Sequence, residues 1–182
     1  MSVFVSKPAP NFELSAYIRG EKDEQRVSLE QYRGKWVVLF FYPRDFTFVC
    51  PTEIQAFGEL EEQFEAENAV VLGASTDSYF SHKAWFETDE RLLGVRYPVL
   101  ADTAQKLSRD YGVLLEDGTA LRGTFIIDPE GVVRKAEIND LDVGRNVADT
   151  LRTLRALRTG ELCPANWDEG QKTLSQELEV VV

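Results

Sequence analysis

The sequence has 182 residues, 43% of them hydrophobic and 28% charged, a composition typical of one ordinary globular domain. Its 20 Lys and Arg residues against 31 Asp and Glu residues give a formal net charge of −11. A surface of that sign repels phosphate backbones and anionic lipids, which argues against nucleic-acid or membrane binding as the main function.

The N-terminal segment lacks the basic stretch, apolar core and small-residue cleavage site of a secretory signal. No apolar run reaches the ~20 residues that a bilayer requires. We therefore expect a cytosolic protein, in which Cys50 and Cys163 are too few to form a disulfide framework. For an arbitrary cytosolic chain, two such cysteines are more often small buried hydrophobes than reactive thiols.

The first half of the chain carries two patterns of buried strands. The run over 36–42 is continuous, apolar and rich in β-branched and aromatic residues, which predicts a central strand, and 69–75 repeats this pattern. A helix is predicted to open at Cys50 and Pro51 between them. Its apolar residues recur every three or four positions, at Ile54, Phe57, Leu60 and Phe64.

The second half alternates between helical and strand patterns. We predict a helix over 79–87, a short strand over 98–100, a helix over 104–111, a hairpin over 124–138 and a long helix over 145–158. This order predicts an α/β domain with a mixed sheet covered by helices on both faces. Residues 161–182 have weaker periodicity and form an appended tail, which is more often mobile than packed.

Cys50 stands where a reactive thiol would be placed. Proline is favoured at the first position of a helix, so Pro51 puts Cys50 beside unpaired N–H groups and the positive end of the helix dipole. Such a position can lower a cysteine pKa from ~8.5 to roughly 3.5–7.5. Because Asp45 and Glu53 oppose this effect, we expect a cation, by preference an arginine, to approach from elsewhere in the chain. Spacing alone does not identify it.

The residues around both cysteines resemble a known family. Residues 43–53, PRDFTFVCPTE, resemble the PxxxTxxC peroxidatic motif of the peroxiredoxins, and 161–167, ELCPANW, resemble their resolving-cysteine segment. The segments 75–77, 82–85 and 122–128 fit as well. The chain is similar to typical two-cysteine peroxiredoxins, of the type of the alkyl hydroperoxide reductase peroxidase subunit. The resemblance implies a thioredoxin-like fold over 1–160, a tail over 161–182 and a thiol-dependent peroxidase with antioxidant function.

The resemblance also implies roles for individual residues. Cys50 would attack the peroxide and become a sulfenic acid, while Arg122 would stabilise the thiolate and the leaving oxygen. Thr47 would hydrogen-bond both the sulfur and the peroxide, and Pro43 would shield the site from water. Glu53 and Arg145 would form a pair that supports the position of Arg122. Taken singly, each has a plainer alternative as a turn, helix or surface residue, so the signal lies in their joint occurrence.

The same resemblance implies how the sulfenic acid is recovered. Cys163 would condense with it to a disulfide, more plausibly from a partner subunit than within one chain, after local unwinding of the first helical turn. An external dithiol protein, thioredoxin-like or a flavoprotein disulfide reductase, would then reduce the bridge. Reciprocal exchange of tails implies a homodimer, and Phe46, Ser78 and Tyr79 match the regions that join five dimers into a decamer.

Other features limit the interpretation. No motif or ligand cluster predicts a nucleotide, flavin or metal, and His82 is expected on an exposed helix outside the active loop. Oxidation-sensitive relatives carry a GGLG segment and a terminal Tyr-Phe pair, whereas here residues 92–95 read LLGV. We therefore hypothesise that Cys50 resists over-oxidation, which retained activity after repeated turnover with excess peroxide would support and rapid sulfinic acid formation would contradict.

The sequence predicts a peroxidase that reduces hydrogen peroxide and organic hydroperoxides, and two other functions are alternatives to it. A holdase that presents apolar surface to unfolding clients is one, although no sequence feature demands it. A thioredoxin-like disulfide exchanger is the other, and it is disfavoured because Cys50 is followed by Pro-Thr-Glu and no CxxC is present.

Overall fold

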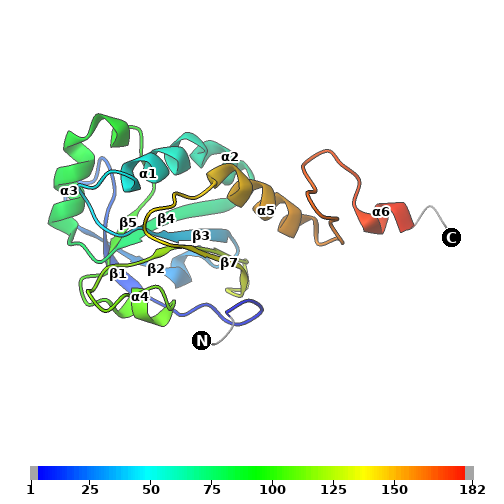
Figure 1. The fold of residues 1–182 in the computed structure, drawn as a ribbon, viewed down its shortest axis with the longest axis horizontal. Coiled ribbons are helices and arrows are strands. Elements are labelled where there is room, and N and C mark those ends of the chain that lie inside the picture. Colours follow the sequence, from blue (N-terminus) through cyan, green and yellow to red (C-terminus); the bar gives the residue numbers. More distant parts are fainter. Residues whose placement is uncertain (1–3, 179–182) are drawn as a thin grey trace. The chain divides into compact units, whose positions relative to one another are not determined.

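A computed structural model describes residues 4–178 of the chain, which form two compact units that divide between Arg145 and Asn146. The first unit contains a mixed sheet with strand order β2-β1-β5-β4-β3-β6-β7 (Figure 1). Its strands are β1 (Glu13–Tyr17), β2 (Gln25–Ser28), β3 (Trp36–Phe41), β4 (Ala69–Ser75), β5 (Val99–Ala101), β6 (Arg122–Ile127) and β7 (Val133–Asn139). Its helices are α1 (Cys50–Glu59), α2 (Glu61–Ala66), α3 (Tyr79–Thr88) and α4 (Lys106–Asp110), with short 3-10 turns at Leu29–Tyr32 and Glu90–Leu92.

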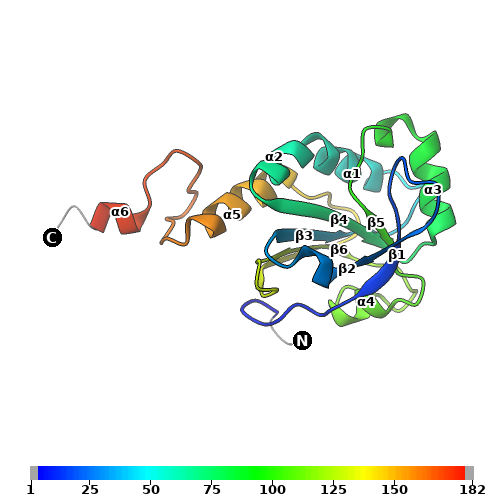
Figure 2. The same ribbon diagram turned by 180° about the vertical axis from the view of Figure 1, so that it is seen from behind.

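Strands β3, β4 and β5 are parallel, and the outer pairs β1–β2, β1–β5, β3–β6 and β6–β7 are antiparallel. The parallel centre is apolar on both faces because helices cover both. Helices α1 and α2 lie on one face and α4 on the other (Figures 1 and 2). This arrangement agrees with the predicted mixed sheet.

The apolar side chains of β3 pack against the helices on both faces of the sheet. Leu39 and Phe41 belong to one core cluster, where they pack with Tyr111 behind α4. Phe40 points to the opposite face and stacks on Phe57 of α1, with ring centroids 4.1 Å apart. Alternate residues of one strand therefore hold both helical layers, and the strand presents Tyr42 and the loop after it at the edge where α1 begins.

The predicted hairpin and the long strands are present close to their expected bounds, but several details differ. Strands β1 and β2 are not among the predicted elements, because they are short antiparallel segments, β2 at the edge of the sheet, whose polar residues give little pattern. The helical stripe from Ile54 to Phe64 is broken at Leu60, which separates α1 from α2.

Helix α4 is also shorter than its predicted range of 104–111. Gln105 adopts a left-handed φ of 59°, which no helix can include, so α4 begins at Lys106. The fully buried carboxylate of Asp102 then accepts hydrogen bonds from the backbone N–H groups of Leu107 and Ser108, at 3.1 and 2.7 Å. These bonds satisfy donors that the first turn of a helix leaves unpaired.

The second unit consists of α5 (Val147–Thr159), α6 (Leu174–Leu178) and the segment that joins them. Helix α5 begins two residues later than predicted, because Asn146 caps it by accepting from the Asp149 N–H. The segment after it is packed rather than loose: Trp167 is buried, and its carbonyl accepts from Arg152 of α5 at 2.8 Å. The division at 160/161 stays a prediction, and residues 179–182 of the predicted tail lie outside the described residues. Within residues 4–178, no helix has the length and apolar character of a membrane span.

The cap at Asp102 predicts a local loss of stability. Asp102→Asn replaces one accepting oxygen by an amide that faces an N–H donor, so we expect the free energy of unfolding to fall by about 1–2 kcal/mol. Urea denaturation followed by far-ultraviolet circular dichroism measures this change. An unchanged midpoint would show that the two hydrogen bonds contribute nothing net.

Candidate active site

Cys50 occupies the first turn of α1 and is fully buried. Pro51 follows it in that turn, as predicted, and Val49 precedes the helix with φ −81°. The Thr52 N–H and hydroxyl both bond to the Val49 carbonyl, at 3.1 and 2.7 Å, which fixes the backbone that carries the sulfur. A short turn at a helix N-terminus therefore holds the thiol out of solvent.

Arg122 is the arginine that approaches the sulfur. It begins β6, has 3% of its surface exposed, and places Nη1 3.5 Å from Cys50 Sγ. The Arg122 Nε–H donates to the carbonyl of Leu141 at 2.8 Å, so the guanidinium is held from two sides. Arg122 is thus the cation that the position of Cys50 led us to expect. Spacing alone did not identify it, but the family resemblance did.

Glu53 joins Arg122 to a second buried arginine. Its Oε2 lies 2.5 Å from Arg122 Nη1, and its Oε1 accepts from the N–H and Nε–H of Arg145 at 3.0 and 2.8 Å. The Arg145 side chain also donates to the carbonyl of Gly123 and lies 5.1 Å from the ring centroid of Phe40. The interpretation of these arginines as solvated surface charges is excluded, because both are at least nine-tenths buried.

Pro43 and Thr47 belong to the loop between β3 and α1. Pro43 is buried in this loop. The Thr47 hydroxyl donates to the carbonyl of Arg44 at 2.9 Å, and the described hydrogen bonds include none from Thr47 to the Cys50 sulfur. The predicted role of Thr47 beside the sulfur therefore stays a prediction.

His82 is buried, and the expectation that it lies on an exposed helix is wrong. Its Nδ1 lies 2.8 Å from Oδ2 of Asp45, which is also buried, and its Nε2 lies 3.2 Å from the carbonyl of Leu100. The sequence did hold a signal, because Tyr79, His82 and Phe86 recur at helical spacing on the face of α3 that is buried. No group of three or more His, Cys, Asp or Glu residues within 4–178 could hold a metal ion.

Tyr42 completes the buried group around Asp45. Its hydroxyl donates to Asp45 Oδ1 at 2.8 Å, and it lies 3.2 Å from His82 Nδ1. Burial raises the pKa of Tyr42 well above its usual value, and the charge of Asp45 raises it further. The phenol therefore remains a hydrogen-bond donor at all physiological pH values.

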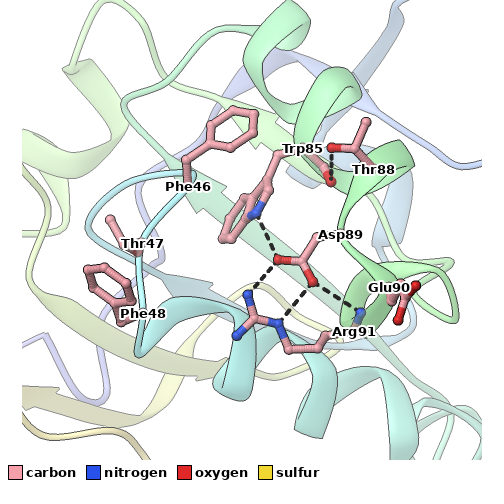
Figure 3. A pocket seen from close by; sticks show the side chains of 8 residues that line it. All are labelled: Phe46, Thr47, Phe48, Trp85, Thr88, Asp89, Glu90 and Arg91. Carbon is pink, nitrogen blue, oxygen red and sulfur yellow. Dashed lines mark hydrogen bonds and ion pairs between the residues drawn. The ribbon is translucent and has the colours of Figure 1, made fainter.

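An open cavity of about 680 Å³ lies beside the active loop (Figure 3). Phe46 and Phe48 of the loop form one side of it, and Trp85 and the Asp89–Arg91 ion pair form the other. Hydrogen bonds from Arg91 lower the pKa of Asp89 to about 2. Phe46 is 61% exposed and Phe48 is 90% exposed, so this side of the molecule presents aromatic surface.

Cys163 lies in the second unit and is half-buried there. Its Sγ is 3.5 Å from Thr159 Oγ1 and 3.7 Å from the carbonyl of Ala156, both near the end of α5. Cys50 and Cys163 are both free cysteines in this structure. The structure thus places the two predicted reactive cysteines in separate units of the chain.

The chain is similar in sequence to known proteins over nearly its whole length. The model of the AhpC/TSA family matches residues 5–136. The chain is 54% identical to peroxiredoxin prdx-2 of Caenorhabditis elegans over 94% of this chain and 88% of that protein, and 51% identical to peroxiredoxin tpx1 of Schizosaccharomyces pombe over 96% and 94%. The chain belongs to the AhpC/TSA family, the peroxiredoxins.

Solved structures support the same assignment for this peroxiredoxin. Reduced 2-Cys peroxiredoxin of Plasmodium vivax superimposes with a TM-score of 0.91 at 36% identity, covering 98% of this chain and 100% of that one. Mycobacterium bovis AhpC gives a TM-score of 0.83 at 38% identity, over 91% and 98% of the two chains. The predicted thioredoxin-like fold and the predicted enzyme class, a thiol-dependent peroxidase, are therefore confirmed.

The buried carboxylate of Glu53 predicts a measurable cost for removing its charge. Glu53→Gln leaves two buried guanidinium groups without a counter-charge, so we expect the free energy of unfolding to fall by about 3 kcal/mol. Glu13→Gln is the matched control, because the Glu13–Arg26 pair is exposed and such pairs contribute about 0–1 kcal/mol. Equal urea midpoints for the two variants would contradict the structural importance of the buried cluster.

Proposed function

We propose that this peroxiredoxin reduces hydrogen peroxide and organic hydroperoxides through a sulfenic acid on Cys50. The contact between Arg122 and the Cys50 sulfur, 3.5 Å long and closed to solvent, is the observation that carries this proposal. A buried guanidinium stays protonated and favours the thiolate over the thiol. The same charge is in place to stabilise an oxygen that becomes negative beside the sulfur.

The first half of the cycle forms one S–O bond and breaks one O–O bond. The Cys50 thiolate attacks the terminal oxygen of the peroxide, and the remaining oxygen leaves as an alcohol or water after it takes a proton. Arg122 would stabilise the charge on the leaving oxygen, Thr47 would align the peroxide, and Pro43 would exclude water. Glu53 and Arg145 act through Arg122, since Glu53 bonds to both guanidinium groups.

The second half of the cycle forms the disulfide. The Cys163 thiolate attacks the sulfur of the Cys50 sulfenic acid, so that an S–S bond forms and the S–O bond breaks. The hydroxide that leaves takes a proton and becomes water. Because Cys50 is fully buried, the first turn of α1 must open before any second sulfur can reach it. We place the reacting Cys163 on a partner subunit, which makes the enzyme a homodimer with two equivalent bridges.

An external dithiol protein would reduce that bridge. The Echinococcus granulosus relative, 52% identical to this chain, is named thioredoxin peroxidase, which favours a thioredoxin-like reductant over a flavoprotein disulfide reductase. The exposed Phe46, together with Ser78 and Tyr79, would join dimers into a decamer, although Tyr79 itself is largely buried within this chain. We retain a cytoplasmic location as part of the proposal.

The cysteine roles are tested by peroxide consumption, first with dithiothreitol and then with thioredoxin and its reductase. Cys50→Ser should be inactive in both assays, while Cys163→Ser should turn over with dithiothreitol alone. Non-reducing electrophoresis of the oxidised wild type should show a dimer that dithiothreitol separates. Residual turnover by Cys50→Ser would overturn the assignment, and a monomeric disulfide would place the bridge within one chain.

The role of Arg122 predicts a large kinetic effect for a substitution that keeps its charge. Lysine cannot hold the sulfur, Glu53 and the Leu141 carbonyl together, so we expect Arg122→Lys to slow the oxidation of Cys50 by about 10²- to 10³-fold. Stopped-flow fluorescence with hydrogen peroxide measures this rate. Arg26→Lys, at an exposed ion pair, is the control and should keep the wild-type rate; a similar rate for Arg122→Lys would remove Arg122 from the mechanism.

A further inference from the structure

The buried group around Asp45 takes no part in the chemistry proposed above. Tyr42 and His82 are fully buried, and Asp45 is 7% exposed. They connect the end of β3 and the active loop to α3, which comes from a separate part of the sequence. A buried and fully hydrogen-bonded polar group of this kind specifies one local arrangement, because any other would leave some of its atoms unpaired.

Hydrogen bonds pair every polar side-chain atom of this group. His82 Nε2 faces the carbonyl of Leu100, which can only accept, so Nε2 carries a proton. The Tyr42 hydroxyl donates to Asp45 Oδ1, so Asp45 Oδ2 has its hydrogen bond with His82 Nδ1, at 2.8 Å. An apolar residue in place of His82 would therefore leave a buried carboxylate oxygen without a partner.

Asp45 is followed by a strained turn. Phe46 has a φ of 55°, in the left-handed region that a bulky side chain rarely adopts. Its ring is largely exposed, with Trp85 at 5.7 Å, so burial of the side chain does not explain the conformation (Figure 3). Strained residues persist where the surrounding structure holds them in place.

Both sides of this turn are held by hydrogen bonds. Before Phe46, the Asp45 N–H donates to Asp77 Oδ2 at 2.9 Å, and the Asp45 carboxylate is fixed by Tyr42 and His82. After Phe46, the Thr47 hydroxyl donates back to the carbonyl of Arg44 at 2.9 Å. The direction in which Thr47 leaves the turn therefore depends on how firmly Asp45 is anchored.

We propose that His82 and Asp45 are positioning residues of the peroxidase, which hold the strained turn at Phe46 and thereby place Thr47 for the reaction at Cys50. The inference rests on the proposed function, in which Thr47 aligns the peroxide. Neither residue touches the reacting atoms. Because Arg122 and Glu53, which set the charge around the sulfur, come from other elements, loss of the anchor affects alignment and leaves the ionisation of Cys50 as it was.

The test uses the full chain with Cys163→Ser as the parent, so that a single oxidation of Cys50 is observed. His82→Leu should slow this oxidation by hydrogen peroxide about 10- to 100-fold, the effect of misplacing a catalytic group by about 1 Å. The thiolate titration of Cys50, followed by absorbance at 240 nm, should keep its midpoint. His82→Asn should recover most of the rate, because its amide restores a donor towards Asp45.

Two further variants separate positioning from general destabilisation. Asp102→Asn also loses hydrogen bonds of a buried carboxylate but does not touch the loop, and it should keep the parental rate. In the Thr47→Val background, His82→Leu should slow the reaction by far less than it does in the parent. The reason is that His82 acts through Thr47, which this background has already lost. If His82→Leu does not fold, Asp45→Asn, which keeps the size of the side chain, takes its place with the same expectations.

Three results would overturn the proposal. A folded His82→Leu or Asp45→Asn variant could oxidise at the parental rate, or its loss of rate could be matched by a displaced thiolate midpoint. The proposal would also be contradicted if the double variant lost rate by the product of the two single fold-reductions, because His82 and Thr47 would then act independently. A parent protein that does not react with peroxide at all would instead refute the proposed function.

Discussion

The carboxylate of Glu53 is the constraint on which the rest of the site depends. It lies on α1 three residues after Cys50 and bonds to Arg122 at the start of β6 and to Arg145 in the segment between β7 and α5. Two guanidinium charges against one carboxylate leave one positive charge in excess beside the sulfur, in a chain whose formal net charge is −11. Burial limits the screening of that charge by water and salt. The cluster therefore gives a positive electrostatic potential at the sulfur, although the net charge of the protein is negative.

Much of this arrangement follows from local sequence. The strand over 36–41 and the helix start at Pro51 are strong one-dimensional patterns, and these patterns by themselves place Cys50 at a helix N-terminus. Arg122, Arg145 and Glu53 come together only in three dimensions, because 69 and 92 positions separate the partners along the chain. Spacing cannot encode such contacts, which is why the family resemblance, and not the physical pattern, identified these residues.

The errors have physical causes as well. A lone histidine between Ser81 and Lys83 reads as a surface residue, yet it lies on the same helical face as Tyr79 and Phe86 and finds its partner 37 residues earlier. The predicted range of α4 is too long because the sequence around Gln105 does not indicate that this residue takes a left-handed conformation. In both cases hydrogen bonds to a buried carboxylate, that of Asp45 or that of Asp102, accompany the departure from the local preference.

The complete burial of the Cys50 sulfur has a consequence for selectivity among reactive molecules. A peroxide adds one small oxygen atom to the sulfur, whereas bulky electrophiles and other protein thiols need a path several atoms wide. While the first turn of α1 is folded, the enclosure therefore selects reactants by size. When that turn opens, the selection is lost. The rate at which a large thiol reagent modifies Cys50 would consequently report how often the first turn of α1 unfolds, much as amide hydrogen exchange reports the opening of a backbone segment.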